Sequence, residues 1–213
     1  MKRVLNTWIK EMLNLQNRIS LSKDSKLKLK EFLKNKAGVL DSKSWTLIHS
    51  RVKNDISSKL LYNQNLRCAY CQRYLYSTVP QIDHFAHKAA YPQFTFITTN
   101  LFYACNYCNS SGIKGQKNTI AVLDNRYDRT KFNILHPYYD DIDSEIIYSD
   151  SDKIIFERAN CSAKGLATIN FFDFDGLPMT LFRSNTLLQE RRNPLLLEDE
   201  RELINRCIAY KAK

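Results

Sequence analysis

The fold of this chain is decided by residues 67–117, which read RCAYCQRYLYSTVPQIDHFAHKAAYPQFTFITTNLFYACNYCNSSGIKGQK. Within them, Cys68 and Cys71 form one C-x-x-C knuckle, and Cys105 and Cys108 form a second. Four thiolates in two such pairs suit the tetrahedral sulfur shell of a structural zinc ion. The spacing therefore predicts that Zn²⁺ holds this stretch together.

Four polar residues lie between and just after the knuckles: Asp83, His84, Asn100 and Asn109. The order of knuckle, Asp-His, Asn, knuckle and Asn resembles the signature of the HNH endonucleases, the ββα-metal family. The match in this chain reads Cys-Ala-Tyr-Cys, Ile-Asp-His-Phe, Thr-Asn-Leu and Cys-Asn-Tyr-Cys-Asn. The resemblance implies an α+β fold with a ββα-metal core that hydrolyses phosphodiester bonds.

The resemblance also implies a role for each of these residues. His84 would be the general base, because an ordinary imidazole pKa suits proton abstraction near neutral pH. Asp83 and Asn109 would bind a catalytic Mg²⁺ or Mn²⁺ through hard oxygen atoms. Asn100 would hold the loop and orient His84 by hydrogen bonding. Asn109 takes the last metal-binding position, where the family has histidine or asparagine, and an amide is a weaker ligand than an imidazole.

Three further residues are candidates for contacts with nucleic acid: His87, Lys114 and Lys117. His87 follows the proposed base closely, and the two lysines follow Asn109. A solvated loop histidine and two surface lysines at the end of a helix need no function, so this alternative stays open.

The charge of the chain favours a nucleic-acid partner. The 213 residues have a net charge of +10, and residues 1–60 hold 14 basic against five acidic residues. Such an excess attracts a phosphate backbone, and we expect DNA as the substrate. A lysine-rich surface that serves only solubility is the alternative.

The hydrophobic pattern indicates a cytoplasmic protein without membrane contact. No apolar run reaches the roughly 18 residues of a membrane span, and the N-terminal residues are too polar for a signal peptide. Paired C-x-x-C motifs in a reducing compartment favour metal binding over disulfides. Cys161 and Cys207 are predicted to be plain buried thiols.

We predict one unit with three parts: a basic helical layer at 1–62, the zinc and nuclease core at 63–120, and a mixed α/β extension at 121–213. Apolar spacing predicts helices over 5–19, over 24–37 and from Asp41 or Ser42 to Leu60. Further helices are predicted over 183–192 and 198–211.

Strands are predicted where β-branched and aromatic residues gather, over 74–79, 82–85 and 94–97. The strand that contains Asp83 should end at His84, since neighbouring strand residues otherwise face opposite sides. A partly helical segment over 101–117 would carry the second knuckle. Strand-like pieces, among them TINFFDFDG at 168–176, should follow residue 121.

The C-terminal part resembles the tail of HNH proteins from bacterial anti-phage operons, the Septu and retron-linked HNH component. The matching pieces are Phe132-Asn133-Ile134-Leu135-His136-Pro137, Asp140 and Ala167-Thr168-Ile169. The resemblance implies a defence role and a regulatory protein partner. The resemblance implies that this partner is an ATPase. The chain itself has no G-x-x-x-x-G-K-[ST] loop. The acidic stretch from Asp140 to Asp152 is the candidate docking surface.

A non-catalytic zinc module that binds nucleic acid or protein is the main alternative. Such a module needs the knuckles and the basic face, but not Asp83, His84 and Asn109 together. A zinc deaminase requires an H-x-E triplet, which the chain lacks. A thiol oxidoreductase needs one exposed C-x-x-C in a βαβ setting, whereas here two pairs flank a β-rich core.

Overall fold

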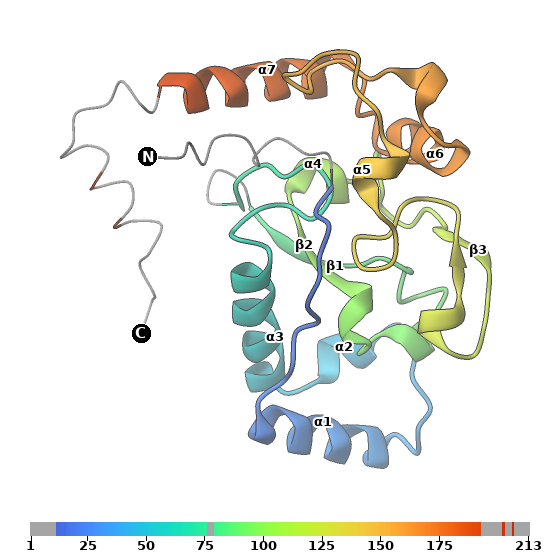
Figure 1. The fold of residues 1–213 in the computed structure, drawn as a ribbon. Coiled ribbons are helices and arrows are strands. Elements are labelled where there is room, and N and C mark those ends of the chain that lie inside the picture. Colours follow the sequence, from blue (N-terminus) through green and yellow to red (C-terminus); the bar gives the residue numbers. More distant parts are fainter. Residues whose placement is uncertain (1–11, 76–78, 193–201, 203–205, 207–213) are drawn as a thin grey trace.

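The computed structural model describes residues 12–75, 79–192, 202 and 206 (Figure 1). Two small antiparallel sheets pair β1 (Gln81–His84) with β2 (Leu101–Ala104), and β3 (Ile120–Val122) with β4 (Lys131–Phe132). The helices described are α1 (Lys23–Asn35), α2 (Ser44–Leu47), α3 (Ser50–Asn63), α4 (Asn106–Asn109), α5 (Ile142–Glu145), α6 (Ala163–Phe172) and α7 (Leu177–Arg192). Short 3₁₀ turns are η2 (Pro92–Phe94), η3 (Thr98–Asn100), η4 (Tyr127–Arg129) and η5 (Arg158–Asn160). This mixture confirms the α+β class.

Residues 12–21 form an extended segment rather than a helix. The backbone N–H groups of Met12 and Leu13 donate to the carbonyls of Tyr70 and Ala69 at 2.7 and 2.9 Å, so the first knuckle takes bonds that a helix would need. Met12 also has a φ of 55°, in the left-handed region. The helix predicted over 5–19 is therefore wrong for 12–19, and 5–11 lie outside the described residues.

The next two predicted helices exist, but the second of them is divided. α1 matches the helix predicted over 24–37, and Gly38 follows it with a φ of +76°. Between α2 and α3 the backbone of Ile48 is extended, with a ψ of 146°. His49 then caps α3, because its Nδ1 accepts the N–H of Arg51 at 3.0 Å. The imidazole of His49 thus stabilises the N-terminus of α3.

β1 ends at His84 as predicted, with Asp83 opposite Phe102 and His84 opposite Leu101 on β2. The returning strand is β2 and not residues 94–97. Pro92 begins the 3₁₀ turn η2, and the side-chain amide of Asn100 donates to the Phe94 carbonyl at 3.0 Å. These backbone groups are therefore not available for pairing with a neighbouring strand.

The knuckles lie at the ends of regular elements. Within the segment 101–117, β2 comes first and only α4 is α-helical, so the second knuckle spans the junction between them. Of the strand predicted over 74–79, Tyr74 forms a single bridge with Arg67, and 76–78 lie outside the described residues.

The C-terminal extension is more helical than its sequence pattern indicates. The strand-like stretch 168–176 begins inside α6, which starts where the Ser162 hydroxyl accepts the N–H of Gly165 at 2.9 Å. α6 ends at Phe172, and the next residue, Asp173, has a φ of 53° in the left-handed region. α7 begins at Leu177, well before the predicted start at 183, and Pro178 is tolerated in its first turn. The helix predicted over 198–211 falls almost wholly outside the described residues.

A cluster of buried aromatic rings connects the first knuckle with β1, β2 and α6. Tyr70 stacks on Phe172 of α6 with ring centroids 4.7 Å apart, and Phe85 lies 6.0 Å from Phe102 of β2. Because these rings belong to one core, the knuckle and the end of β1 are held in fixed relation. A second cluster packs α3 against β2, with Val52, Ile56, Leu60 and Leu101 in its centre.

Candidate metal centre and the Asp83–His84 site

The two knuckles meet in one buried cluster. The sulfur atoms of Cys68, Cys71, Cys105 and Cys108 all lie within 4.8 Å of one another, and those of Cys71 and Cys105 are 3.6 Å apart. A tetrahedral zinc ion with Zn–S bonds of about 2.3 Å spaces its sulfurs by about 3.8 Å. All four cysteines are free thiols, so the cluster can hold a structural zinc ion.

The pKa values of three of these thiols are shifted in different directions. Hydrogen bonds from Cys108 lower the pKa of Cys105, whereas hydrogen bonding to Cys105 raises the pKa of Cys71 and burial raises that of Cys108. Cys105 is therefore the thiolate that is favoured, because the neighbouring cysteines keep their protons and donate hydrogen bonds to its sulfur. Four thiolates together require a bound metal ion to offset their charge.

Asp83 is nearly buried on β1, and both oxygens of its carboxylate have partners. The hydroxyl of Tyr70 donates to Oδ2 at 2.5 Å, and Nζ of Lys114 lies 3.0 Å from Oδ1 and 3.0 Å from Oδ2. Burial, and after it the charge of Asp83, raises the pKa of Tyr70 well above its usual value. Tyr70 therefore remains a hydrogen-bond donor to the carboxylate.

Lys114 is completely buried, with an exposed fraction of 0%. Its ammonium also donates to the backbone carbonyl of His84 at 2.9 Å. A buried ammonium is stable only when it is paired and hydrogen-bonded, and Asp83 provides that pairing. The structure thus places Lys114 inside the protein, and not on the surface where a contact with phosphate was expected. Lys117 is exposed, with Nζ 3.3 Å from the Gly112 carbonyl.

His84 ends β1 with its ring against Trp45 of α2. The two rings meet edge to face with centroids 4.9 Å apart, and His84 is only 3% exposed. Its Nε2 lies 3.1 Å from the Thr95 carbonyl, which can only accept, so Nε2 carries the proton and Nδ1 the lone pair. Burial, and then the charge of Lys88, lowers the pKa of His84 to about 3, which keeps the ring neutral at physiological pH.

Asn100 is completely buried and ties down the loop after His84. Its Oδ1 accepts the N–H of Ala86 at 2.7 Å and the hydroxyl of Tyr127 at 2.9 Å. The loop held in this way supplies the Thr95 carbonyl that binds the imidazole. Asn100 was expected to hydrogen-bond His84 itself, but its described bonds act on His84 only through this loop.

His87 belongs to the same group of charges. After burial, the charges of Lys114 and Lys88 lower the pKa of His87, and the charge of Asp83 raises it. Its side chain is partly exposed, so His87 is the more accessible of the two imidazoles.

A divalent cation fits Asp83 by its chemistry but not by its present contacts. Carboxylate and carbonyl oxygens are the ligands that Mg²⁺ and Mn²⁺ prefer, yet the ammonium of Lys114 already neutralises Asp83. Asn109 lies beside β1, where its amide donates to Gln81 at 2.8 Å. Among the described residues, only the four cysteines form a group of His, Cys, Asp or Glu side chains that could hold a metal.

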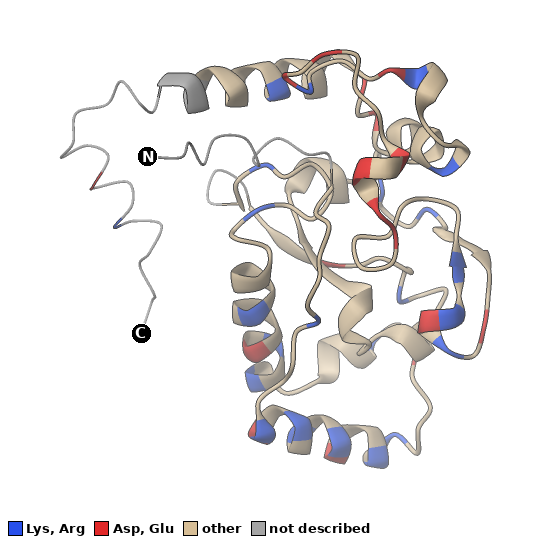
Figure 2. Ribbon diagram, in the orientation of Figure 1, with Lys and Arg blue, Asp and Glu red and all other residues tan. Residues whose placement is uncertain are grey.

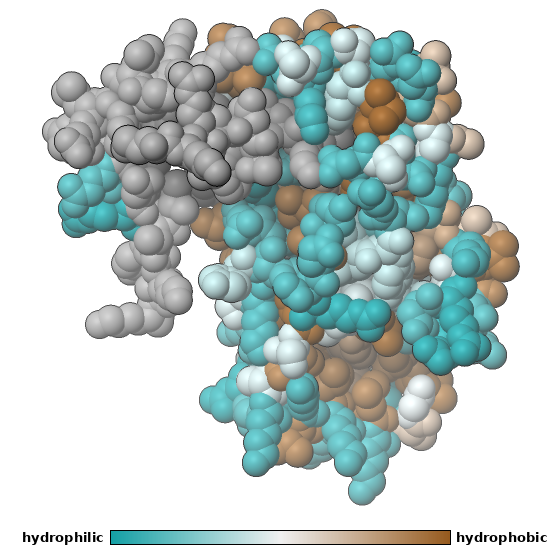
Figure 3. Space-filling view, viewed as in Figure 1, coloured by the Kyte–Doolittle hydropathy of each residue, from teal (hydrophilic) through white to brown (hydrophobic). Residues whose placement is uncertain are grey.

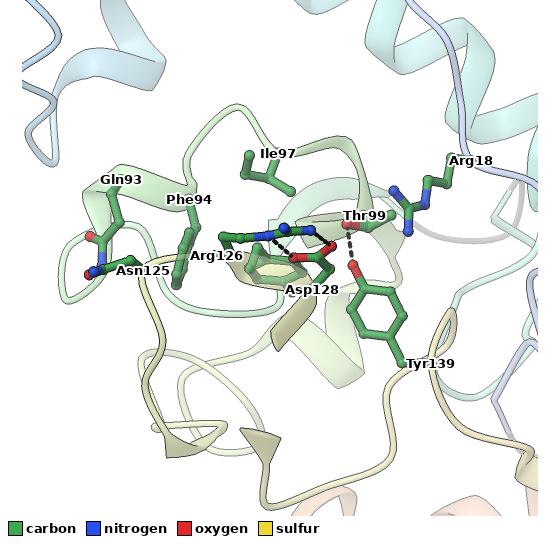
Figure 4. Close-up of a pocket in the computed structure, with 10 residues that line it drawn as sticks. Arg18, Gln93, Phe94, Ile97, Thr99, Asn125, Arg126, Asp128 and Tyr139 are labelled. Atoms are coloured by element: carbon green, nitrogen blue, oxygen red, sulfur yellow. Dashed lines mark hydrogen bonds and ion pairs between the residues drawn. The ribbon is translucent and has the colours of Figure 1, made fainter. Parts of the chain in front are cut away.

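A surface hollow of about 350 Å³ adjoins the loop that Asn100 holds (Figure 4). Its lining includes Tyr127, the hydrogen-bond partner of Asn100, and the exposed side chain of Arg18. Arg126 in the same hollow is paired with Asp128 at 2.6 Å.

Sequence reasoning missed several residues that surround Asp83 and His84. Tyr70 lies between two of the clustered cysteines, and its place inside the first knuckle was the available signal. The sequence holds no comparable signal for Trp45 and Thr95, because their contacts with His84 join separate segments of the chain.

Within the described part of the chain, no helix combines the length and apolar character needed to cross a membrane. Comparisons with models of protein families and with curated protein sequences found no match to this chain.

Proposed function

We propose that this protein is an HNH endonuclease that hydrolyses phosphodiester bonds of DNA and acts in bacterial anti-phage defence. The observation that supports the proposal is the position of Asp83 and His84 at the end of β1, paired with a strand that leads directly into the cysteine cluster. A strand pair clamped in this way gives the two side chains a fixed setting, which phosphodiester hydrolysis needs.

In this proposal His84 is the general base. The Thr95 carbonyl fixes the proton on Nε2 and leaves the Nδ1 lone pair to accept one from water. A pKa of about 3 makes a weak base, but an approaching phosphate anion raises the pKa of a nearby imidazole. Because His84 is only 3% exposed, the side chains around its ring have to open before water can reach it. A divalent cation, when bound, would supply positive charge to the phosphate.

The experiment that tests the proposal is nicking of supercoiled plasmid by the zinc-loaded chain with added Mg²⁺ or Mn²⁺. We expect relaxed circles that depend on the added cation, because hydrolysis needs positive charge at the phosphate. Single-stranded DNA and RNA in parallel reactions identify the preferred substrate. A plasmid that is bound but stays intact at every cation concentration would refute the nuclease function.

The non-catalytic zinc module is the second candidate, and two observations favour it. His84 is almost inaccessible, and the charge of Asp83 is neutralised by Lys114. A module of this kind would bind DNA through its basic surface without cutting it. The same plasmid experiment separates the two candidates.

The surface proposed to bind DNA is α1, which carries basic side chains along its length (Figure 2). Hydrophilic side chains line the outer edge of this end of the molecule, with hydrophobic side chains among them (Figure 3). On α3, by contrast, Arg51 is paired with Asp24, and Lys59 with Asp55, at 3.1 Å each. Lys23 and Lys30 of α1 are exposed, and neither has a side-chain partner among the described contacts.

We expect the affinity for DNA to fall about ten-fold between 50 and 200 mM salt for every two phosphates that the protein neutralises. The double variant Lys23→Gln/Lys30→Gln should reduce the slope of log K against log salt by about two. The matched control is Lys131→Gln/Lys153→Gln, which removes the same charge from other elements. Fluorescence anisotropy with a labelled duplex measures both slopes. Equal losses in the two variants would contradict a binding role for α1.

The proposal includes a regulatory protein partner, an ATPase, that restrains the nuclease. The docking surface suggested between Asp140 and Asp152 is largely used by the protein itself: Asp140 pairs with Lys164 at 2.7 Å, and Asp150 accepts the N–H of Ile155 at 2.8 Å. Acidic side chains there are consequently poor evidence for a partner. Full nicking activity of the isolated chain would contradict the proposal that a partner protein regulates it.

A further inference from the structure

The ammonium of Lys114 lies where three oxygen atoms converge. Its Nζ is 3.0 Å from each carboxylate oxygen of Asp83 and 2.9 Å from the carbonyl of His84. An anionic carboxylate and a backbone carbonyl are the ligand types that hard divalent cations take. The side chain of Lys114 is completely buried, so these oxygens serve as its solvation shell.

Lys114 lies in a surface turn that follows the second knuckle. Its own N–H donates to the carbonyl of Cys108 at 3.2 Å, which joins it to that knuckle. The neighbours at 111, 112, 116 and 117 are exposed, so Lys114 and the partly buried Ile113 are inward-facing side chains within a surface turn. Gly115 has a φ of +44° in this turn, a conformation that favours glycine.

We propose that Lys114 is an internal competitor for the cation site of Asp83, which binds Mg²⁺ or Mn²⁺ only after the ammonium has left. This inference rests on the proposed nuclease function, because that function supplies the need for a cation. Lys114 thereby acts as a positioning residue that holds Asp83 in a neutralised form. Its departure leaves Oδ1 of Asp83 and the His84 carbonyl to take the incoming ion, while Oδ2 keeps the hydroxyl of Tyr70.

The test is the affinity of the zinc-loaded Lys114→Met variant for Mn²⁺. The electron paramagnetic resonance signal of free Mn²⁺ measures how much of the ion is bound. Methionine has a similar length and no charge. Since a nearby cation shifts the affinity of a carboxylate for a proton by about 10- to 1,000-fold, we expect Lys114→Met to bind Mn²⁺ at least ten-fold more tightly than the unchanged protein. Lys131→Met, on the exposed surface of β4, is the control and should leave Mn²⁺ affinity unchanged.

The gain should disappear in Lys114→Met/Asp83→Asn, because the carboxylate is then absent. Mn²⁺ should also raise the melting temperature of Lys114→Met more than that of the unchanged protein. A folded Lys114→Met with unchanged or weaker Mn²⁺ binding overturns the inference, since Lys114 is then only a structural partner of Asp83.

A second measurement uses the unchanged protein and decides the matter if Lys114→Met does not fold. Acetylation by an amine-reactive reagent, read by peptide mass spectrometry, should spare Lys114 without Mn²⁺ and modify it in millimolar Mn²⁺. Lys164, paired with Asp140, should react equally under both conditions. Protection of Lys114 that persists while Mn²⁺ is bound overturns the inference. Mn²⁺-dependent exposure without any plasmid nicking would instead refute the nuclease function and leave the competition standing.

Discussion

Replacement of both Cys68 and Cys105 by serine is expected to unfold the region around β1 and β2. The unchanged protein should purify with one structural zinc, because four buried thiols within 4.8 Å of one another form a closed shell. Structural zinc sites contribute apparent binding free energies of about 10–16 kcal/mol to folding. This range matches or exceeds the whole stability of most domains, roughly 5–15 kcal/mol, so loss of the metal should be decisive.

Metal analysis by mass spectrometry and thermal melting measure the two parts of this prediction. Cys161→Ser is the matched control, because Cys161 is also a free thiol but lies outside the cluster and contacts the backbone of residue 147. The control should keep its zinc and melt near the unchanged protein. Full zinc content and normal melting in the double cysteine variant would show that the cluster is not the metal site.

The parts of the fold that the sequence predicts well are those specified locally. Each C-x-x-C pair has a spacing that fixes a tight turn, and the cluster of the two pairs follows from their shared preference for a metal. α1 lies close to the helix predicted over 24–37, and Gly38 follows it with a positive φ, as a glycine after a helix commonly does. The end of β1 at His84 also follows from local geometry.

The parts that it predicts poorly depend on hydrogen bonds between distant segments. Met12 and Leu13 have helical apolar spacing, but their N–H groups bond the first knuckle. Residues 94–97 have strand-like composition, but Asn100 and His84 take the carbonyls of Phe94 and Thr95. In both cases tertiary partners outweigh a local preference of a few tenths of a kcal/mol per residue.

The candidate site divides in the same way. The sequence identified Asp83, His84 and Asn100, and the structure brings them to one strand end and its loop. It did not reveal that Lys114 is buried, because a lysine in a short stretch with two glycines and several polar residues has the local signal of a surface turn. The burial depends on a carboxylate 31 residues earlier, which no local pattern encodes.

Substitution of His84 is expected to have the largest effect on catalysis. If its Nδ1 accepts the proton of the attacking water, His84→Ala should lower the rate of plasmid nicking by about 10²–10⁴-fold, the usual contribution of a general base. His84→Gln is the matched variant, because its amide can still donate to the Thr95 carbonyl but cannot act as a base. Zinc content, melting and DNA affinity should stay near those of the unchanged protein.

Two comparisons assign that effect to the base rather than to the cation. Higher Mg²⁺ or Mn²⁺ should recover part of the activity lost in Asp83→Ala, where a cation ligand is missing, but none of the activity lost in His84→Gln.

His87→Ala should retain most of the activity, since His87 is proposed only to touch the phosphate. The buried position of His84 makes this comparison decisive, because His87 is the more accessible imidazole in the same group of charges. Loss in His87→Ala with unimpaired nicking by His84→Gln would transfer the base to His87. Unimpaired nicking by both variants would end the histidine mechanism altogether.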